Sequence, residues 1–112
     1  MVPIPVIIIP VLIRYDLLER CIDSLDYPVE KIIIIDNGGQ IEDDCLVMPR
    51  NSKHGKTYIY DMPSNLGVAT SWNLGIKMTP FAKGWIMLNS DAWFAPNQLR
   101  KFFDGCVSDE IH

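Results

Sequence analysis

The sequence predicts an α/β protein, a three-layer α/β/α sandwich in which helices cover both faces of a mainly parallel sheet. Apolar, β-branched runs alternate along the chain with segments of helical periodicity, and this order is typical of a parallel sheet. The run at residues 31–35 reads Lys-Ile-Ile-Ile-Ile without alternation, as expected for a strand that is covered on both faces. At 112 residues the chain is predicted to be a single domain, residues 1–112.

Four strands are expected from the apolar runs. They lie at residues 6–13, 31–35, 57–60 and 85–88, and the first is rich in valine and isoleucine. Pro10 within the first run is expected to mark a bend, or a place where the strand leaves the hydrogen-bonded ladder, because proline has no N–H to donate.

The first and last helices are predicted from their ends. Asp16 and Glu19 have the spacing of a capping box, so the first helix is expected to open there. Pro96 suits the first turn of the last helix, and Gly105 is expected to end it.

A middle helix is expected at residues 68–78. Gly75 lies inside it, where glycine costs about 1 kcal/mol relative to alanine. We therefore expect close packing against Gly75.

Charge and cysteine content exclude several classes of protein. The net charge of −4 argues against a nucleic-acid surface, which normally carries a basic patch. The longest apolar stretch, residues 2–13, holds three prolines and is too short to span a bilayer, and it lacks the features of a signal peptide. Three widely spaced cysteines, Cys21, Cys45 and Cys106, fit reduced thiols, so a cytoplasmic protein is expected.

Two aspartates follow strands directly. Asp36 comes after the run at residues 31–35, and Asp91 comes after the run at residues 85–88 through Asn89 and Ser90. Ligands of α/β sheets bind outside the carboxyl ends of the strands, so these side chains are candidates for a site that holds a metal or a polar ligand. Taken alone, Asp36 could instead be a turn former and Asp91 a helix cap.

A dinucleotide-binding site is disfavoured. The stretch at the end of the first strand and its turn reads Pro10-Val-Leu-Ile-Arg-Tyr15, which contains no glycine. A backbone without glycine cannot approach a pyrophosphate in the way that G-x-G-x-x-G permits, and a P-loop is absent for the same reason.

Several short motifs occur together in one order. They are Pro10-Val11, Ser24-Leu25, Ile-Ile-Ile-Ile-Asp-Asn-Gly at 32–38, Asn-Leu-Gly-Val-Ala at 65–69, Trp-Asn-Leu-Gly-Ile at 72–76 and Leu-Asn-Ser-Asp at 88–91. In this combination and spacing the chain resembles the amino-terminal, donor-binding half of a GT-A fold glycosyltransferase of the family 2 type. Such enzymes use nucleotide-diphosphate sugars, so a UDP- or dTDP-linked sugar is the expected partner.

The resemblance implies roles for five residues of the nucleotide site. Pro10 and Val11 would line the base, and Asp36 would accept a hydrogen bond from an imide N–H of the base. Asn65 and Gly67 would lie in a loop close to the nucleotide, where a residue without Cβ leaves room.

The resemblance also implies a metal site at the acidic motif. Asp91 would bind Mg²⁺ or Mn²⁺, which would bridge it to the diphosphate, since hard cations prefer oxygen ligands. The family's motif is often Asp-x-Asp, whereas this chain has Asn89 in the first position. An amide there can still bind a ribose hydroxyl, and Asn-x-Asp resembles the rhamnosyltransferase-like members.

The catalytic half of the family's site is not recognised in this sequence. In the family, the catalytic base and the acceptor-binding segments follow the acidic motif, and this chain ends about twenty residues after Asp91. We therefore expect residues 1–112 to be a truncated GT-A fold that lacks the acceptor and catalytic-base half. The alternative is a non-catalytic nucleotide-sugar-binding or interaction module of the same fold. A shortened sheet would expose apolar surface, so a homo-oligomer is also expected.

Overall fold

The computed structural model describes residues 3–39 and 55–110, with side chains as far as residue 105. Its elements are β1 (Ile4–Val11), α1 (Tyr15–Asp23), β2 (Val29–Asp36), β3 (Lys56–Asp61), α2 (Val68–Met78), β4 (Ile86–Met87) and α3 (Gln98–Glu110). The strands form one sheet in the order β3-β2-β1-β4, and every pair is parallel. The predicted α/β class is confirmed.

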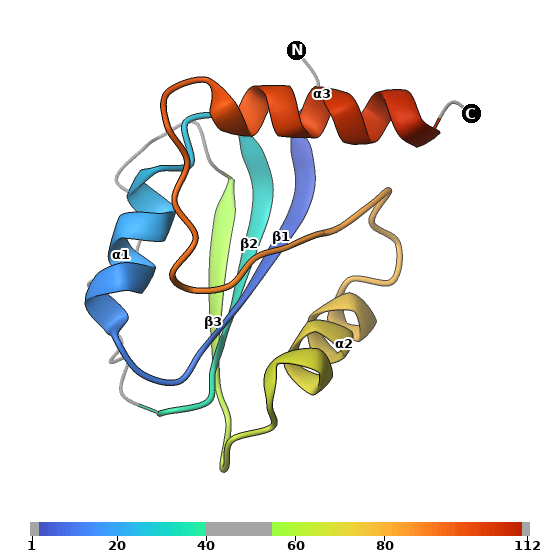
Figure 1. Cartoon of the computed structure of the whole chain (residues 1–112). Coiled ribbons are helices and arrows are strands. Elements are labelled where there is room, and N and C mark those ends of the chain that lie inside the picture. Colours follow the sequence, from blue (N-terminus) through green and yellow to red (C-terminus); the bar gives the residue numbers. More distant parts are fainter. Residues whose placement is uncertain (1–2, 40–54, 111–112) are drawn as a thin grey trace.

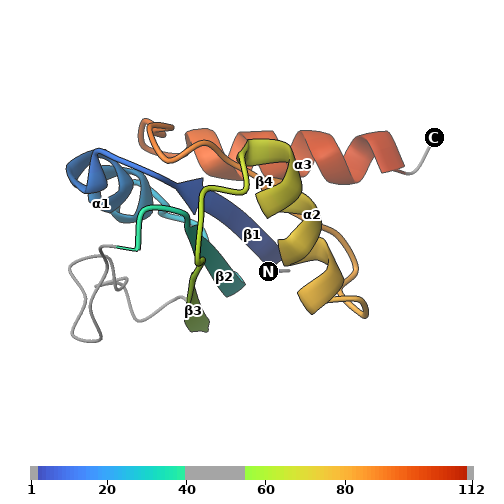
Figure 2. The same cartoon turned by 90° about the horizontal axis from the view of Figure 1, so that it is seen from below.

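Helices cover the two faces of the sheet separately, as Figures 1 and 2 show. Side chains of α1 and α3 join one core cluster with Ile7, Ile9, Ile32 and Ile34. Side chains of α2 pack on the other face, against a cluster of Val6, Ile8, Ile33 and Ile35. Alternate residues of β1 and β2 therefore point into two cores, which explains why β1 is apolar throughout and β2 is apolar from Ile32 to Ile35.

The segment between β4 and α3 crosses the face that α1 covers, beside α1 (Figure 1). Two backbone amides of this segment are hydrogen-bonded near the end of α1. Phe94 N–H donates to Ser24 Oγ at 3.2 Å, and Asn97 N–H donates to Asp26 Oδ2 at 2.9 Å. These bonds fix the path of the chain just after Asp91.

The expected bend at Pro10 is wrong. Pro10 stays in the ladder opposite Ile35, and β1 continues to Val11. Because β4 pairs only with Ile7 and Ile8, no described strand lies beside Pro10 on that side to need its missing N–H.

The capping role of Asp16 and the helix end at Gly105 are also wrong. α1 begins at Tyr15, after Arg14 in a left-handed conformation, and no side chain at the N-cap position caps it. Asp16 lies inside α1, and its carboxylate binds chiefly the Arg14 guanidinium. α3 continues through Gly105 to Glu110, because glycine lowers helix propensity without preventing a helix.

The close packing expected at Gly75 is confirmed. A Cβ placed on Gly75 would lie 2.6 Å from Cγ2 of Ile8 in β1. Glycine thus lets α2 approach the centre of the sheet.

Candidate nucleotide-sugar site at the carboxyl edge of the sheet

A hollow of about 460 Å³ opens at the carboxyl ends of the strands, and we refer to it as the edge pocket. Its lining residues are Pro10, Val11, Leu12, Ile13, Arg14, Leu17, Asn37, Asn65, Gly67, Val68, Asn89, Ser90 and Asp91. All the candidate residues named from the sequence are among them except Asp36. Segments far apart in the sequence meet here because β1, β2 and β4 are parallel and end at one edge.

Asp36 lies beneath the edge pocket and is fully buried. Its Oδ1 accepts three hydrogen bonds: from Tyr15 Oη at 2.7 Å, from Gly39 N–H at 2.9 Å and from Gly38 N–H at 3.2 Å. A carboxylate with several donors is stabilised where it is buried. Asp36 thus joins the start of α1 to the turn after β2, behind the lining of the edge pocket.

Gly38 is required by this arrangement. A Cβ at Gly38 would overlap both the Tyr15 hydroxyl and the backbone carbonyl of Leu12. The turn after β2 therefore packs directly on the β1–α1 loop, which forms one wall of the edge pocket.

That wall presents exposed aliphatic side chains. Leu12 and Ile13 are 42% and 66% exposed. With Pro10 and Leu17 they give the edge pocket an apolar side, suited to the flat face of a ring rather than to a charged group.

Arg14 is the basic residue in the lining, and its backbone is in the left-handed region with φ 58°. Its Nε and Nη2 donate to the two carboxylate oxygens of Asp16 at 3.0 and 2.9 Å. This hydrogen-bonded pairing lowers the pKa of Asp16 and raises that of Arg14. Both side chains are largely exposed, so the pair contributes little to stability.

The β3–α2 loop forms the opposite wall. Asn65 Oδ1 accepts a hydrogen bond from Gly67 N–H at 2.9 Å, and Gly67 has φ 79°, a conformation that favours glycine. No acidic residue lies in the first turn of α2 and no side chain caps it. The positive end of the α2 dipole therefore faces the edge pocket next to Gly67 and Val68.

The polar floor of the edge pocket is residues 89–91, directly after β4. Ala92 N–H donates to the carbonyl of Asn89 at 3.0 Å, so the segment turns sharply here. Asn89 and Asp91 are exposed at the turn. They offer an amide and a carboxylate to the edge pocket, with the Ser90 hydroxyl between them.

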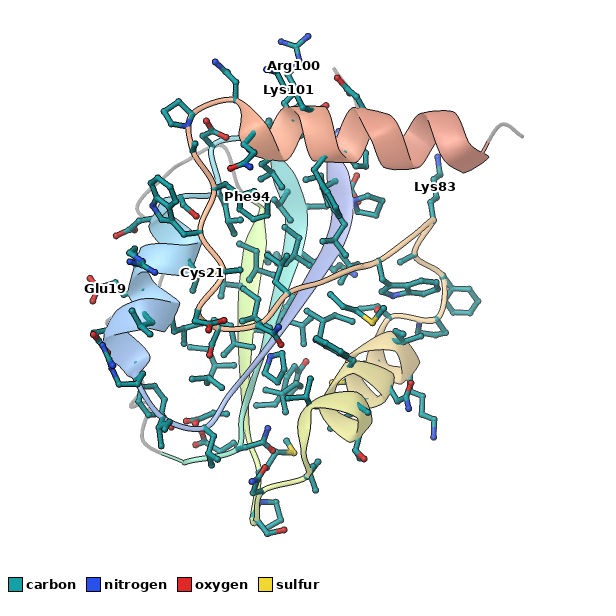
Figure 3. All side chains as sticks on the ribbon, viewed as in Figure 1. Glu19, Cys21, Lys83, Phe94, Arg100 and Lys101 are labelled. Atoms are coloured by element: carbon teal, nitrogen blue, oxygen red, sulfur yellow. The ribbon has the colours of Figure 1, made fainter. Side chains whose placement is uncertain are left out.

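Asp91 also influences the core beneath it. Figure 3 shows Cys21 on the side of α1 that faces the sheet, whereas Glu19 projects outward. Burial raises the pKa of the Cys21 thiol to about 12, and the negative charge of Asp91 acts in the same direction. Cys21 is a buried free thiol, as expected; Cys45 and the side chain of Cys106 lie outside the described part of the chain.

A hard cation fits the donors at residues 89–91 only in part. The side chains of Asn89, Ser90 and Asp91 all offer oxygen, which Mg²⁺ and Mn²⁺ prefer. Within residues 3–39 and 55–105, however, no three His, Cys, Asp or Glu side chains are grouped to hold an ion. The protein can thus supply part of a coordination shell, which water and ligand oxygens would have to complete.

Asn37 is a lining residue that the sequence reasoning did not single out. It is 8% exposed, and both polar atoms of its side chain are hydrogen-bonded to the opposite wall of the edge pocket. The available signal was its position directly after a strand-end aspartate, within the motif at 32–38.

The fold and the edge pocket together define a class: a parallel α/β domain with a partly polar hollow at the carboxyl edge of its sheet. The sequence model of "Glycosyl transferase family 2" matches residues 6–109 of this chain. The chain therefore belongs to glycosyl transferase family 2, and its all-parallel sheet agrees with the GT-A fold. The comparison with curated proteins found no match. In the part of the chain that the structure describes, no helix is both long and apolar enough to cross a membrane.

Proposed function

We propose that the edge pocket binds a UDP- or dTDP-linked sugar as the donor for glycosyl transfer. The observation that carries this proposal is the convergence of Asn65, Gly67, Asn89 and Asp91 on one hollow, in a chain of family 2. With Pro10 and Val11, the lining residues named from the sequence come from three separate segments, in the order typical of the family.

The base would bind on the apolar wall. Pro10 and Val11 offer backbone groups and apolar surface there, and Leu12 and Ile13 extend that surface to the rim. The imide N–H of the base would donate to the carboxylate of Asp36, whose Oδ1 already accepts three hydrogen bonds within the protein. Asp36 would otherwise act through the wall that it supports.

The diphosphate would bind between Gly67 and Asp91. Its negative charge would be favoured by the uncapped amino end of α2, where backbone N–H groups and the helix dipole both attract anions. The Asn89 amide would hydrogen-bond a ribose hydroxyl from the floor.

Mg²⁺ or Mn²⁺ would be held by Asp91 with help from the donor's own oxygens. When bound, the ion would neutralise the charge that develops on the nucleotide-diphosphate leaving group. Because the described residues supply only part of a shell, we expect weak metal binding by the protein alone and much tighter binding with a nucleotide diphosphate.

A second candidate function is a nucleotide-sugar-binding or interaction module without transfer activity. It is favoured by one observation: the only carboxylate among the described lining residues is Asp91, which the metal would occupy. An inverting transfer also needs a carboxylate near the acceptor hydroxyl to take its proton. Sugar transfer by the protein, or donor hydrolysis faster than in buffer alone, would reject the hypothesis of a module without transfer activity.

Calorimetric titration with UDP and dTDP, with and without Mn²⁺, tests the donor site. We expect metal-dependent binding that Asp91→Asn weakens roughly tenfold or more, since the ion loses its charged ligand. Asp23→Asn removes an exposed carboxylate of α1 outside the edge pocket and serves as the matched control. The proposal would be rejected if the affinity for UDP and dTDP were the same with and without Mn²⁺. It would also be rejected if the affinity fell equally in Asp91→Asn and Asp23→Asn.

The homo-oligomer and the cytoplasmic location stay predictions. Phe81 is 97% exposed and Phe102 is 48% exposed, which supplies apolar surface for an association between copies. Sedimentation at tens of micromolar protein would test this, and a monomer would contradict it.

A further inference from the structure

We propose that Asn37 is a positioning residue of the edge pocket, which holds the β3–α2 loop in the conformation that receives the donor. This inference rests on the proposed function and deepens it. Asn37 follows β2, whereas the loop and α2 follow β3, so its side chain joins two segments that the backbone alone leaves independent.

Three hydrogen bonds make this connection, which we call the Asn37–Ser71 link. Asn37 Nδ2 donates to Ser71 Oγ at 2.9 Å, and Asn37 Oδ1 accepts from Leu66 N–H at 3.0 Å. Ser71 Oγ in turn donates to the carbonyl of Gly67 at 2.7 Å. Ser71 is fully buried and Asn37 nearly so, hence the bond between their side chains is screened from water, while the bonds to Leu66 and Gly67 are partly buried.

The direction of every proton in the link is fixed. Leu66 N–H can only donate, so the oxygen of the Asn37 amide must face it and the nitrogen must face Ser71. The Gly67 carbonyl can only accept, so the single hydroxyl proton of Ser71 must point to it. The hydroxyl oxygen is then free to accept from Asn37. Only an amide at position 37 satisfies both neighbours at once.

The link acts on the residues that would touch the donor. Leu66 and Gly67, the two loop residues that it holds, lie between Asn65 and Val68, both of which line the edge pocket. Gly67 is also the residue before α2, in a left-handed conformation that fixes the direction of the first helical N–H groups. Loss of the link would loosen one wall of the edge pocket. The side chains of Asn65 and Asp91, which would contact the ligand, would both remain.

The other end of α2 provides a matched control. Thr79 Oγ1 donates to the carbonyl of Gly75 at 2.9 Å and accepts from Trp85 Nε1 at 2.8 Å. Thr79 is 8% exposed and does not line the edge pocket. The chemistry matches that of Ser71: a buried hydroxyl donates four residues back and accepts one N–H.

The test compares Asn37→Asp and Ser71→Ala with Thr79→Val. Asn37→Asp keeps an acceptor for Leu66 N–H but forces the Ser71 hydroxyl to donate to the new carboxylate, so Gly67 loses its side-chain donor. We expect both site variants to bind UDP with Mn²⁺ about tenfold more weakly, and Thr79→Val to bind it as the wild type does. Chemical denaturation measures stability in parallel, and we expect Ser71→Ala and Thr79→Val to lose comparable amounts.

A double-mutant cycle between Asn37→Ala and Ser71→Ala gives the decisive readout. If the link positions the loop, the double variant loses less UDP affinity than the sum of the two single losses, because both variants remove the same Asn37–Ser71 bond. Additive losses, or equal weakening by Thr79→Val, would show that general destabilisation explains the effect and would overturn the proposal.

Hydrogen exchange in the ligand-free protein separates this inference from the donor proposal. We expect faster exchange of the Leu66 amide in Asn37→Ala and unchanged exchange in Thr79→Val. Unchanged Leu66 exchange in Asn37→Ala would overturn the positioning role whether or not nucleotide binds. Suppose instead that Leu66 exchanges faster in Asn37→Ala but the wild-type protein binds neither UDP nor dTDP. That result would reject the donor site and, with it, the positioning role, and the link would be purely structural.

Discussion

The two ends of α2 use the same chemistry for different purposes. At the amino end, Ser71 donates to the Gly67 carbonyl and accepts from Asn37, which lines the edge pocket. At the carboxyl end, Thr79 donates to the Gly75 carbonyl and accepts from Trp85, which packs on the core. The comparison teaches that a buried hydroxyl is not a sign of function by itself. What differs is the partner, which lines the edge pocket at one end and packs on the core at the other.

A second contrast follows from what surrounds each end. The amino end of α2 opens on exposed groups such as Asn65 and Val68, whereas the carboxyl end leads into the half-buried Trp85 and the short strand β4. We expect changes near the amino end to affect binding and stability together, and changes near the carboxyl end to affect stability alone. The following predictions test that separation, from the largest expected effect to the smallest.

Gly38→Ala should be the most damaging of these changes. The added Cβ would overlap the Leu12 carbonyl, a backbone atom that cannot yield without moving the wall of the edge pocket, so we expect a loss of about 3 kcal/mol. Nucleotide binding should weaken with it. Chemical denaturation and calorimetry measure the two effects.

Gly39→Ala is the matched control for Gly38→Ala. Gly39 has φ 64° but open space around it, so alanine there should cost only about 1 kcal/mol from the left-handed backbone. Equal losses in the two variants would show that the contact with the β1–α1 loop is unimportant.

Gly75→Ala should destabilise the protein by about 1 kcal/mol and leave nucleotide binding unchanged. Overlap with the Ile8 side chain opposes the gain in helix propensity, and the contact lies in the core rather than at the edge pocket. Asn73→Ala, at an exposed position of α2, gives the propensity gain without the overlap. If Gly75→Ala is as stabilising as Asn73→Ala, the close approach of α2 to β1 does not limit stability.

Trp85→Phe should cost about 1 kcal/mol of stability, because it removes the indole N–H that donates to Thr79 while keeping an aromatic ring in the core. UDP binding should not change. Denaturant titration of Trp85→Phe, Thr79→Val and the double variant would measure the coupling. Weakened nucleotide binding in Trp85→Phe would break the proposed separation between the two ends.

The smallest effect concerns pH. The pKa of Cys21 is raised by burial from 9.0 to about 12, so above pH 9 the unfolded chain loses a proton that the folded protein keeps. Stability is therefore fully present below pH 9 and should fall by roughly 1 kcal/mol between pH 8 and 10. Denaturant titrations at both pH values should show this loss in the wild type and not in Cys21→Ala.

Asp91→Asn tests the second cause of the raised pKa of Cys21. Because the charge of Asp91 acts in the same direction as burial, the pKa of the thiol in the folded protein should be lower in the variant than in the wild type. An unchanged pKa in a spectroscopic titration of the folded proteins would show that Asp91 does not influence the thiol beneath it.

The strand pattern was predictable because burial on both faces leaves a strong signal in the sequence. The uninterrupted isoleucines of β2 could belong only to a covered strand, and α2 was predicted with its bounds, Val68–Met78. Helix ends were less predictable. Asp16 has the right spacing for a cap, but Arg14 lies close enough to donate to both of its carboxylate oxygens. A sequence motif does not show which of two possible partners a side chain will bind.

The candidate site was predictable to the extent that the strands are parallel. Asp91 and Asn65 could be placed at one edge from strand order and family resemblance, since the carboxyl ends of parallel strands meet there. Asp36 and Asn37 show the limit. They are adjacent in the sequence, yet the first is buried behind the edge pocket and the second lines it. Alternation along a strand sends neighbours to opposite sides, and small changes of direction at the strand end decide which one meets the ligand.

The sequence by itself determined the α/β class, the family and the segments that supply the candidate site, because apolar patterning and motif order are local properties of the chain. The tertiary structure decided which side chains meet there. The pairing of Asn37 with Ser71, the burial of Asp36 under Tyr15 and the contact of Gly75 with Ile8 each join segments separated by more than twenty residues. Such contacts depend on the positions of the helices relative to the sheet, and these positions depend on the packing of the whole core.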